Sequence, residues 1–246
     1  MGLRRYHVSA TSTQTEAIEW ARAGAAPGSR VIAGKQLMGV GRLCHRWDSP
    51  SGGLYMSLVT SDPVVSPSLV PLAVGIGLQQ LFTETYGATP KLRWPNDLMI
   101  PGAGGGARKL GGVLVDRVES GRAAPALVVG VGVNVNAASS AFDPALRPTL
   151  VGLAELTERP VDLRDLEEKV TDRVLASVSR LQLPDGPASI VEEVRRALYG
   201  VGRPALVDGD PVGTIRGVAD DGALEVETDR HVSRIMAGSL TVEESA

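Results

Sequence analysis

Three extended runs of residues constrain the fold of this chain more than any other feature. They cover residues 91–99, 109–119 and 126–136, and the last two consist mainly of small and β-branched residues. Such residues favour the pleated, half-buried surface of a sheet. The last two runs are joined across Ser120-Gly121, so we expect neighbouring antiparallel strands there.

The rest of the chain predicts further strands and several helices. Apolar spacing indicates helices at 13–23, 67–86, 163–178 and 190–198, and buried strands at 31–34 and 54–60. After Gly200, turn pairs such as Asp208-Gly209 and Asp221-Gly222 separate short strands. We therefore predict an α+β fold, with a main unit over residues 1–198 and a small C-terminal β unit over residues 199–246.

Composition excludes several classes of protein. The 246 residues are 43% hydrophobic and 22% charged, which is typical of a globular protein. Lys and Arg number 25 against 28 Asp and Glu, so no basic excess indicates binding to nucleic acid. No apolar run has the length of a membrane span or a signal peptide. With Cys44 as its single cysteine, the chain is expected in the cytoplasm, away from membranes.

Two N-terminal segments carry polar residues that could contact a ligand. Ser12-Thr13-Gln14 begins the first predicted helix, where a role as helix cap is the simpler interpretation. Residues 34–55 form a long loop with repeated glycines, among which lie cationic side chains such as Arg42. Glycines let backbone N–H groups approach a ligand closely, and cations suit an anion. The alternative is a mobile surface loop.

Two further segments place polar residues in or beside strands. In residues 93–97, Arg-Trp-Pro-Asn-Asp, the proline ends a strand and puts Asn96 and Asp97 at its tip. A carboxylate there is either a magnesium ligand for a nucleotide or part of a simple turn. Lys109 opens an apolar strand, and Asn134 and Asn136 alternate with valine on the next. We expect both asparagines to form hydrogen bonds, to a ligand or to loop carbonyls.

Taken in order, these segments resemble the catalytic domain of biotin protein ligases. The family pattern runs Ser-Thr-Asn, Gln, Gly-Arg-Gly-Arg-x-Gly-Arg, Trp-x-Ser-Pro-x-Gly, Lys-Trp-Pro-Asn-Asp, Lys-Leu-x-Gly-Ile-Leu and Gly-x-Gly-x-Asn. The corresponding stretches here are 12–14, Gln36, 39–45, 47–52, 93–97, 109–114 and 130–134. The tail after Gly200 resembles the SH3-like β-barrel of the family. Since little chain precedes Ser12, the resemblance is to the form without DNA-binding helices.

The resemblance implies a mixed, largely antiparallel sheet flanked by helices and a reaction in two steps. Biotin and ATP would give biotinyl-5′-AMP, and a lysine of a biotin carboxyl carrier protein would then take the biotin. ATP and Mg²⁺ would enter as co-substrate and metal, with no tightly bound prosthetic group, and a homodimer is possible in this family. The implied biotin-binding residues are Ser12, Thr13, Gln14, Gln36, Gly39, Val40, Gly41, Arg42 and Lys109. Lys109 and Arg42 would be catalytic, Asp97 would hold Mg²⁺, and Trp94, Asn96, Asp97 and Asn134 would bind ATP.

The departures from the family pattern fall mostly in one loop. Val40 and His45 stand where the family has arginine, and Cys44 stands where it has glycine, while Arg93 for lysine is a mild change. These differences leave two alternatives open. One is a ligase for another small carboxylate, such as lipoate or octanoate, and the other is a non-catalytic sensor of such an acid.

Overall fold

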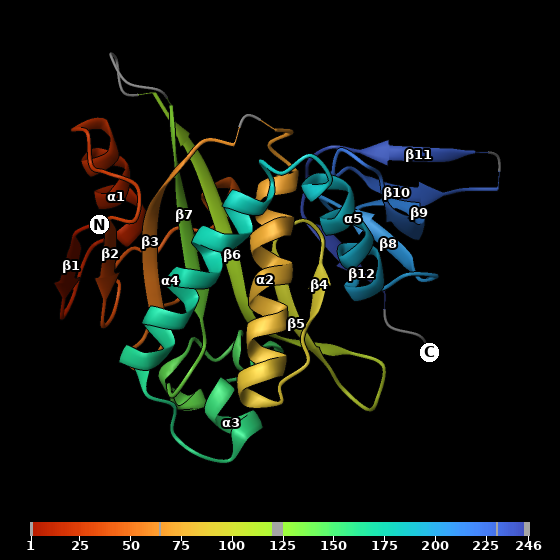
Figure 1. The fold of residues 1–246 in the computed structure, drawn as a ribbon. Helices are drawn as coiled ribbons and strands as arrows, with labels where there is room; N and C mark the ends of the chain where they lie inside the picture. Colours follow the sequence, from red (N-terminus) through yellow and green to blue (C-terminus); the bar gives the residue numbers. More distant parts are fainter. Residues whose placement is uncertain (1, 64, 120–124, 230, 244–246) are drawn as a thin grey trace.

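In a computed structural model of the chain, the structure describes residues 2–63, 65–119, 125–229 and 231–243. Its largest element is a seven-stranded sheet in the order β1-β2-β3-β7-β6-β5-β4 (Figure 1). The strands are β1 (Arg4–His7), β2 (Arg30–Ala33), β3 (Leu54–Ser61), β4 (Lys91–Arg93), β5 (Asp97–Pro101), β6 (Ala107–Val118) and β7 (Ala126–Val133). Only the β1–β2 pair of this sheet is parallel, so the predicted mixed, largely antiparallel sheet is confirmed.

The three extended runs form strands, with two differences in detail. Residues 91–99 make two strands, β4 and β5, because Pro95 has no N–H for the ladder and lies in the turn between them. Strand β7 ends at Val133, so Asn134 and Asn136 follow the strand and do not alternate within it as predicted. Strands β6 and β7 pair antiparallel from Gly111↔Val133 to Val118↔Ala126, and the predicted Ser120-Gly121 turn lies outside the described residues.

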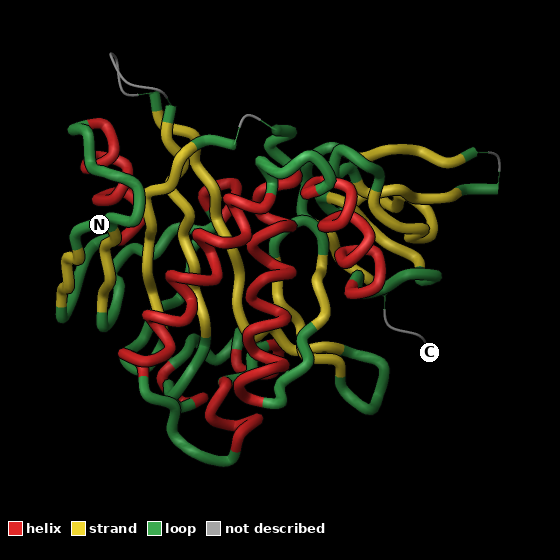
Figure 2. Tube along the Cα trace, in the orientation of Figure 1, coloured by secondary structure: helices red, strands yellow, loops and turns green. Residues whose placement is uncertain are grey.

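Helices cover both faces of the large sheet. Helices α2 (Leu69–Tyr86) and α4 (Leu163–Arg180) lie side by side in front of it in Figures 1 and 2. Helix α1 (Thr13–Arg22) packs on the other face. In strand β3, Leu58 belongs to the buried hydrophobic cluster that includes α2 and α4, whereas its neighbour Val59 belongs to the cluster that includes α1. This alternation is the ordinary consequence of the two-residue period of a strand.

The C-terminal part forms a second sheet beside the first. It has five antiparallel strands in the order β11-β10-β9-β8-β12, so the predicted small β unit is present (Figure 1). Its strands are β8 (Pro204–Val207), β9 (Asp210–Val218), β10 (Leu224–Glu227), β11 (Val232–Ile235) and β12 (Leu240–Val242). Among the described residues, β11 and β12 stand at opposite ends of this order, and their pairings do not close a barrel.

The two sheets share one hydrophobic core. Ile215, Val218 and Leu224 of the second sheet belong to the same buried cluster as helix α2. The indole Nε1 of Trp94 donates to the Gly222 carbonyl at 2.9 Å, and helix α5 (Gly186–Ala197) lies between the sheets. The short helix α3 (Leu153–Thr157) and the 3-10 turns η1 (Arg42–Cys44), η2 (Ser139–Ala141) and η3 (Arg147–Thr149) complete the elements.

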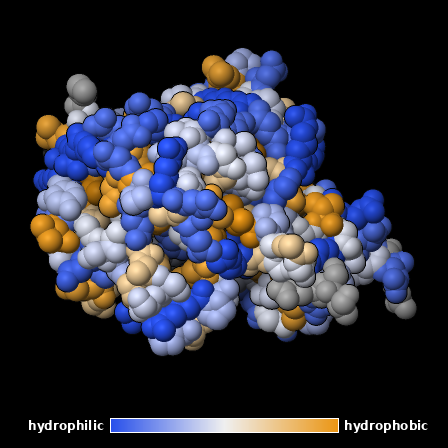
Figure 3. Space-filling view, turned by 90° about the horizontal axis from the view of Figure 1, so that it is seen from below, coloured by the Kyte–Doolittle hydropathy of each residue, from blue (hydrophilic) through white to orange (hydrophobic). Residues whose placement is uncertain are grey.

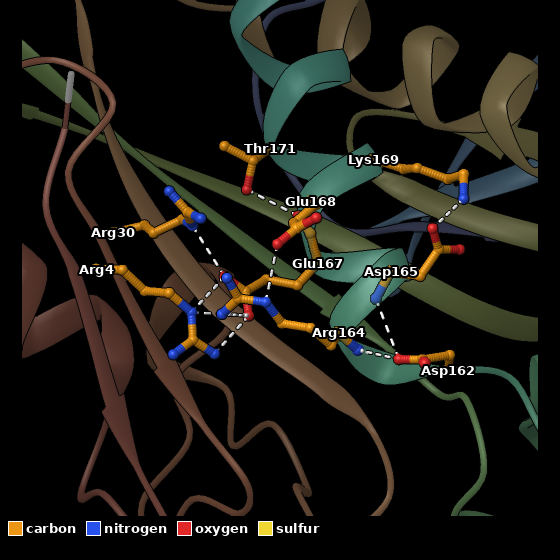
Figure 4. Close-up of polar contacts among 9 residues, drawn as sticks. All are labelled: Arg4, Arg30, Asp162, Arg164, Asp165, Glu167, Glu168, Lys169 and Thr171. Carbon is orange, nitrogen blue, oxygen red and sulfur yellow. Dashed lines mark hydrogen bonds and ion pairs between the residues drawn. The ribbon is translucent and has the colours of Figure 1, made fainter.

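A buried carboxylate ties the edge of the large sheet to helix α4. Glu167 of α4 is 2% exposed and accepts hydrogen bonds from Arg4 of β1, at 2.7 to 3.1 Å, and from Arg30 of β2, at 2.9 Å (Figure 4). Burial alone would raise the pKa of Glu167, but the two guanidinium groups outweigh it and lower that pKa. The first two strands are therefore held to the helical layer by charge as well as by packing.

Among the residues that the structure describes, none of the helices could span a membrane. On the face that Figure 3 shows, hydrophilic side chains predominate and apolar ones lie between them in separate groups. Such scattered apolar groups are normal on a protein surface.

Candidate active site

The predicted motifs meet around one cavity of about 330 Å³. Its wall is formed by the beginning of α1, the loop of residues 36–47, strands β3, β6 and β7, and the β4–β5 turn. Residues 239–241 of the second sheet close one side. The lining includes Thr13, Gln14, Gln36, Val40, Gly41, Arg42, Trp47, Ser57, Arg93, Trp94, Asn96, Asp97, Lys109, Gly130 and Gly132.

A cluster of opposite charges lies at one end of the cavity. Asp97 begins β5, and its two carboxylate oxygens lie 2.6 Å from Lys109 Nζ and 2.6 Å from Arg93 Nη2. Burial raises the pKa of Asp97, but Lys109 and Arg93 outweigh it, so the pKa lies below its ordinary value. Asp97 is therefore ionised, and the cluster with Arg42 keeps an excess of positive charge facing the cavity.

Arg42 comes from the glycine-bearing loop and reaches the second sheet. Its Nη1 donates to the Gly238 carbonyl at 3.0 Å. Burial lowers the pKa of Arg42, while Asp97 and Asp208 act against this. A partly desolvated guanidinium interacts more strongly with an anion than one in water does. Arg42 thus brings a cation from the loop to the same end of the cavity as Lys109.

The Trp47 ring packs against the backbone of two glycines. A side-chain carbon at Gly132 would come within 2.7 Å of the Trp47 ring, and one at Gly112 within 3.4 Å, so the flat ring needs bare backbone beneath it. Lys109 Nζ is 4.9 Å from the ring centroid, within the range of a cation–π contact. The buried indole Nε1 has no hydrogen-bond partner among the described residues. Trp47 therefore packs between strands β6 and β7 and the lysine.

Uncharged polar side chains gather at the other end of the cavity. The first turn of α1 supplies Thr13 and Gln14, β3 supplies Ser57, and the loop supplies Gln36. Gln36 Oε1 accepts from the backbone N–H of Thr13 at 2.8 Å, and Thr13 Oγ1 lies 3.0 Å from Ser57 Oγ. Ser12 is the N-cap of α1, accepting from the Thr15 N–H, as the cap interpretation predicts.

Most of the predicted site residues line this cavity, but three do not. Ser12, Gly39 and Asn134 are absent from its lining. Asn134 is 2% exposed, and its side chain donates to the Lys109 carbonyl, while that of Asn136 donates to the Val161 carbonyl. Both asparagines thus bond to backbone carbonyls, Asn134 to one of strand β6 and Asn136 to one of a loop, and the contact of Asn134 with ATP stays a prediction.

Several residues that line the cavity were not in the predicted set. One of them, Ser57, could have been found from the sequence pattern. Ser57 is a polar residue inside the otherwise apolar strand β3, and such a residue needs a partner. Arg93, Gly130 and Gly132 belong to the predicted motifs at 93–97 and 130–134, but no binding role was assigned to them. Ser239, Leu240 and Thr241 come from the second sheet, whose approach to the cavity no local pattern indicates.

Asp97, the predicted magnesium ligand, is paired with two cations in this arrangement. Each of its oxygens lies 2.6 Å from a cationic nitrogen, one of Lys109 and one of Arg93. Among the described residues, no group of three or more His, Cys, Asp or Glu side chains could hold a metal ion. Asp97 here acts as a counter-ion that orients Lys109 and Arg93, and its role in holding Mg²⁺ stays a prediction.

Comparisons with known proteins show the family of this chain. The profile of the biotin/lipoate A/B protein ligase family matches residues 7–134, just over half of the chain. The chain belongs to that family. Among curated family members, the bifunctional ligase/repressor BirA of Bacillus subtilis is 26% identical over 243 residues, which cover 96% of this chain and 72% of BirA. The biotin–[acetyl-CoA-carboxylase] ligase of Mycobacterium tuberculosis is 26% identical, covering 97% of this chain and 89% of that ligase.

Solved structures of the family show the same fold. The biotin protein ligase from Aquifex aeolicus, in complex with biotin and ATP, superposes with a TM-score of 0.83 at 23% identity. The match covers 98% of this chain and 99% of the Aquifex protein. Because it extends over nearly the whole of both chains, the arrangement of the large sheet, its helices and the second sheet is the family arrangement.

Proposed function

We propose that this protein is an ATP-dependent biotin protein ligase. One observation carries the proposal: a single cavity joins a cationic end, with Lys109 and Arg42, to an uncharged polar end, with Thr13, Gln36 and Ser57. Biotin has this division, because its valeryl carboxylate is charged while its ureido ring offers two N–H donors and a carbonyl. The curated relatives named as biotin ligases support this function over lipoate or octanoate transfer.

In the first step, an oxygen of the biotin carboxylate attacks the α-phosphorus of ATP. The bond between that phosphorus and the bridging oxygen breaks, and pyrophosphate leaves. The two anions repel each other, so we assign Lys109 and Arg42 to neutralise them and the charge that develops in the transition state. The ion pair with Asp97 fixes the position of the Lys109 ammonium group. Mg²⁺ enters with the phosphates of ATP, which supply oxygen ligands of their own.

In the second step, the amine of a carrier-protein lysine attacks the carbonyl carbon of biotinyl-5′-AMP, and AMP leaves. The mixed anhydride must be kept from water until the carrier arrives. Residues 40–42 and 45–47 of the loop line the cavity together with residues 239–241, and the hydrogen bond from Arg42 to Gly238 links the two segments. We assign this pair of segments to retaining the adenylate.

Further parts of the proposal concern partners and organisation. The acceptor is a biotin carboxyl carrier protein or domain, and the protein acts in the cytoplasm, where such carriers would meet it. Residues 1–198 form the catalytic unit, and residues 199–246 form a unit that closes the cavity beside Arg42. Self-association into a homodimer is to be measured by sedimentation with and without biotin and ATP.

The test is ATP–pyrophosphate exchange with biotin, lipoate and octanoate in parallel. Only biotin is expected to support exchange, and adding a carrier domain should then yield a biotinylated lysine, detected by mass spectrometry. Exchange with lipoate or octanoate, but not with biotin, would show that one of those acids is the substrate. Binding of an acid without any exchange would make the protein a sensor.

A further inference from the structure

A chain of buried hydrogen bonds runs beneath the polar end of the cavity. Gln14 Nε2 donates to Asp116 Oδ2 at 2.8 Å and to the Val128 carbonyl at 3.1 Å. On its other side, Gln14 Oε1 accepts from Ser57 Oγ at 2.8 Å. Gln14 is 5% exposed and Ser57 1% exposed, while Asp116 is half-buried, so the amide and the hydroxyl are largely shielded from water.

The two acceptors fix the direction of the Gln14 amide. A carboxylate and a backbone carbonyl only accept hydrogen bonds, so both N–H groups of the amide must face them. The amide oxygen is therefore turned toward Ser57. Gly130 makes room for it, because a side-chain carbon at that position would lie 2.5 Å from Gln14 Oε1. A flipped amide would set its oxygen against two other oxygens.

The direction of the Gln14 amide decides what Ser57 and Thr13 can offer a ligand. The Ser57 hydroxyl has one hydrogen, and Gln14 takes it. The Thr13 hydroxyl also has one, which goes to Ser57 Oγ at 3.0 Å or to Gln36 Oε1 at 3.1 Å. Neither hydroxyl has a hydrogen left for the cavity, so both present only lone pairs to it.

Gln36 supplies the complementary donor. Its Nε2 gives one hydrogen to Ser49 Oγ at 2.9 Å, and Ser49 in turn donates to the Trp47 carbonyl at 3.1 Å. The second hydrogen of Gln36 Nε2 is free of these bonds. The polar end thus offers two acceptors and one donor, which is the complement of a cyclic urea with two N–H groups and one carbonyl.

We propose that Gln14, held by Asp116 and the Val128 carbonyl, is a positioning residue that turns Ser57 and Thr13 into acceptors and so makes the site selective for ring N–H groups. Gln14 acts through Ser57, and Asp116, outside the cavity lining, acts through Gln14. The inference rests on the proposed function, because it takes biotin as the ligand. It adds a specificity-determining arrangement to the binding residues already described.

The test compares biotin with its two cyclic carbamate analogues, in each of which one ring N–H is replaced by oxygen. Dissociation constants are measured by calorimetry for the wild type and Gln14→Met, which keeps the bulk but removes the acceptor. In the wild type, the carbamate whose ring oxygen faces Ser57 should bind at least about tenfold more weakly than biotin, since two oxygens meet without a hydrogen. In Gln14→Met this preference should fall by about tenfold, because the freed Ser57 hydroxyl can donate to the ring oxygen.

The controls separate selectivity from loss of structure. Gln79→Met makes the same change on α2, where the amide donates to Thr83 Oγ1 and to no other described residue, and should leave the preference unchanged. Ser57→Ala should also lower the preference, and it carries the test if Gln14→Met does not fold. A merely structural role would weaken biotin and both carbamates equally. The inference would be overturned if folded Gln14→Met and Ser57→Ala kept the wild-type preference, or if the wild type showed no preference. A wild type that binds none of the three compounds would instead refute the proposed function.

Discussion

Replacing Lys109 by alanine should abolish adenylate formation while the protein remains folded. Lys109 Nζ lies 2.6 Å from Asp97 and 4.9 Å from the Trp47 ring, and the side chain is 23% exposed, so it is held in place but open to the cavity. Loss of one well-placed donor to developing negative charge typically costs about 3 to 4 kcal/mol of transition-state stabilisation. The expected fall in the rate of exchange is therefore roughly 100- to 1,000-fold.

The effect on stability should be much smaller than the effect on rate. Without Lys109, Asp97 still pairs with Arg93 at 2.6 Å, so the buried carboxylate keeps a cationic partner. The lost charge-assisted hydrogen bond corresponds to about 1.5 to 3 kcal/mol of unfolding free energy. Urea unfolding, followed by circular dichroism, measures this loss.

Biotin-dependent ATP–pyrophosphate exchange is the assay, and Arg108→Ala is the matched control. Arg108 is the preceding residue on β6, it is 44% exposed, and it pairs with the exposed Glu155 at 2.7 Å. Its removal should change exchange by less than about threefold, as surface ion pairs contribute little. The reasoning is refuted if folded Lys109→Ala retains more than about a tenth of the wild-type exchange.

Three further predictions concern stability and the altered loop. Glu167→Gln should lower the unfolding free energy by about 3 kcal/mol at pH 7. Because the pKa of Glu167 is lower in the folded state, this loss should shrink below about pH 4.5, as Glu167 of the wild type becomes protonated. A difference in unfolding free energy that does not change with pH would contradict the prediction. Trp94→Phe removes the donor to Gly222 and should cost about 1 to 3 kcal/mol in urea unfolding, whereas an unchanged midpoint would show that the bond between the sheets contributes nothing. Val40→Arg with His45→Arg should tighten biotin binding in calorimetry by about tenfold and reduce release of free adenylate, and the idea fails if neither quantity changes.

Local sequence patterns were sufficient for most of the helices and strands, although not for β1 or α3, and most of the predicted site residues line the cavity. Strand and helix periods depend on side chains that alternate within a few residues, so β6, β7 and the helices could be predicted from 109–119, 126–136 and the apolar spacing. Pro95 has no N–H to donate, so the break in the strand before Asp97 followed from one residue. The glycine-bearing loop, with Gln36 and Arg42, was likewise visible.

Tertiary structure decided the partners of those residues. Nothing in the order of residues shows that Asp97 meets both Lys109 and Arg93, a pairing that makes it their counter-ion. The end of β7 at Val133, one residue before Asn134, turned an expected strand residue into a loop residue bonded to a carbonyl. Hydrogen bonds of this kind depend on distances between segments far apart in the chain.

The sequence by itself determined which chemical groups the site contains, and the fold determined in which direction each can act. Ser12, Thr13 and Gln14 read as a helix start, yet only Ser12 is limited to capping it. Gln14 meets Asp116 across 102 positions of chain because α1 packs on the face of β6 and β7 that carries Asp116. A hydroxyl or amide can donate or accept, and only its three-dimensional neighbours remove that freedom.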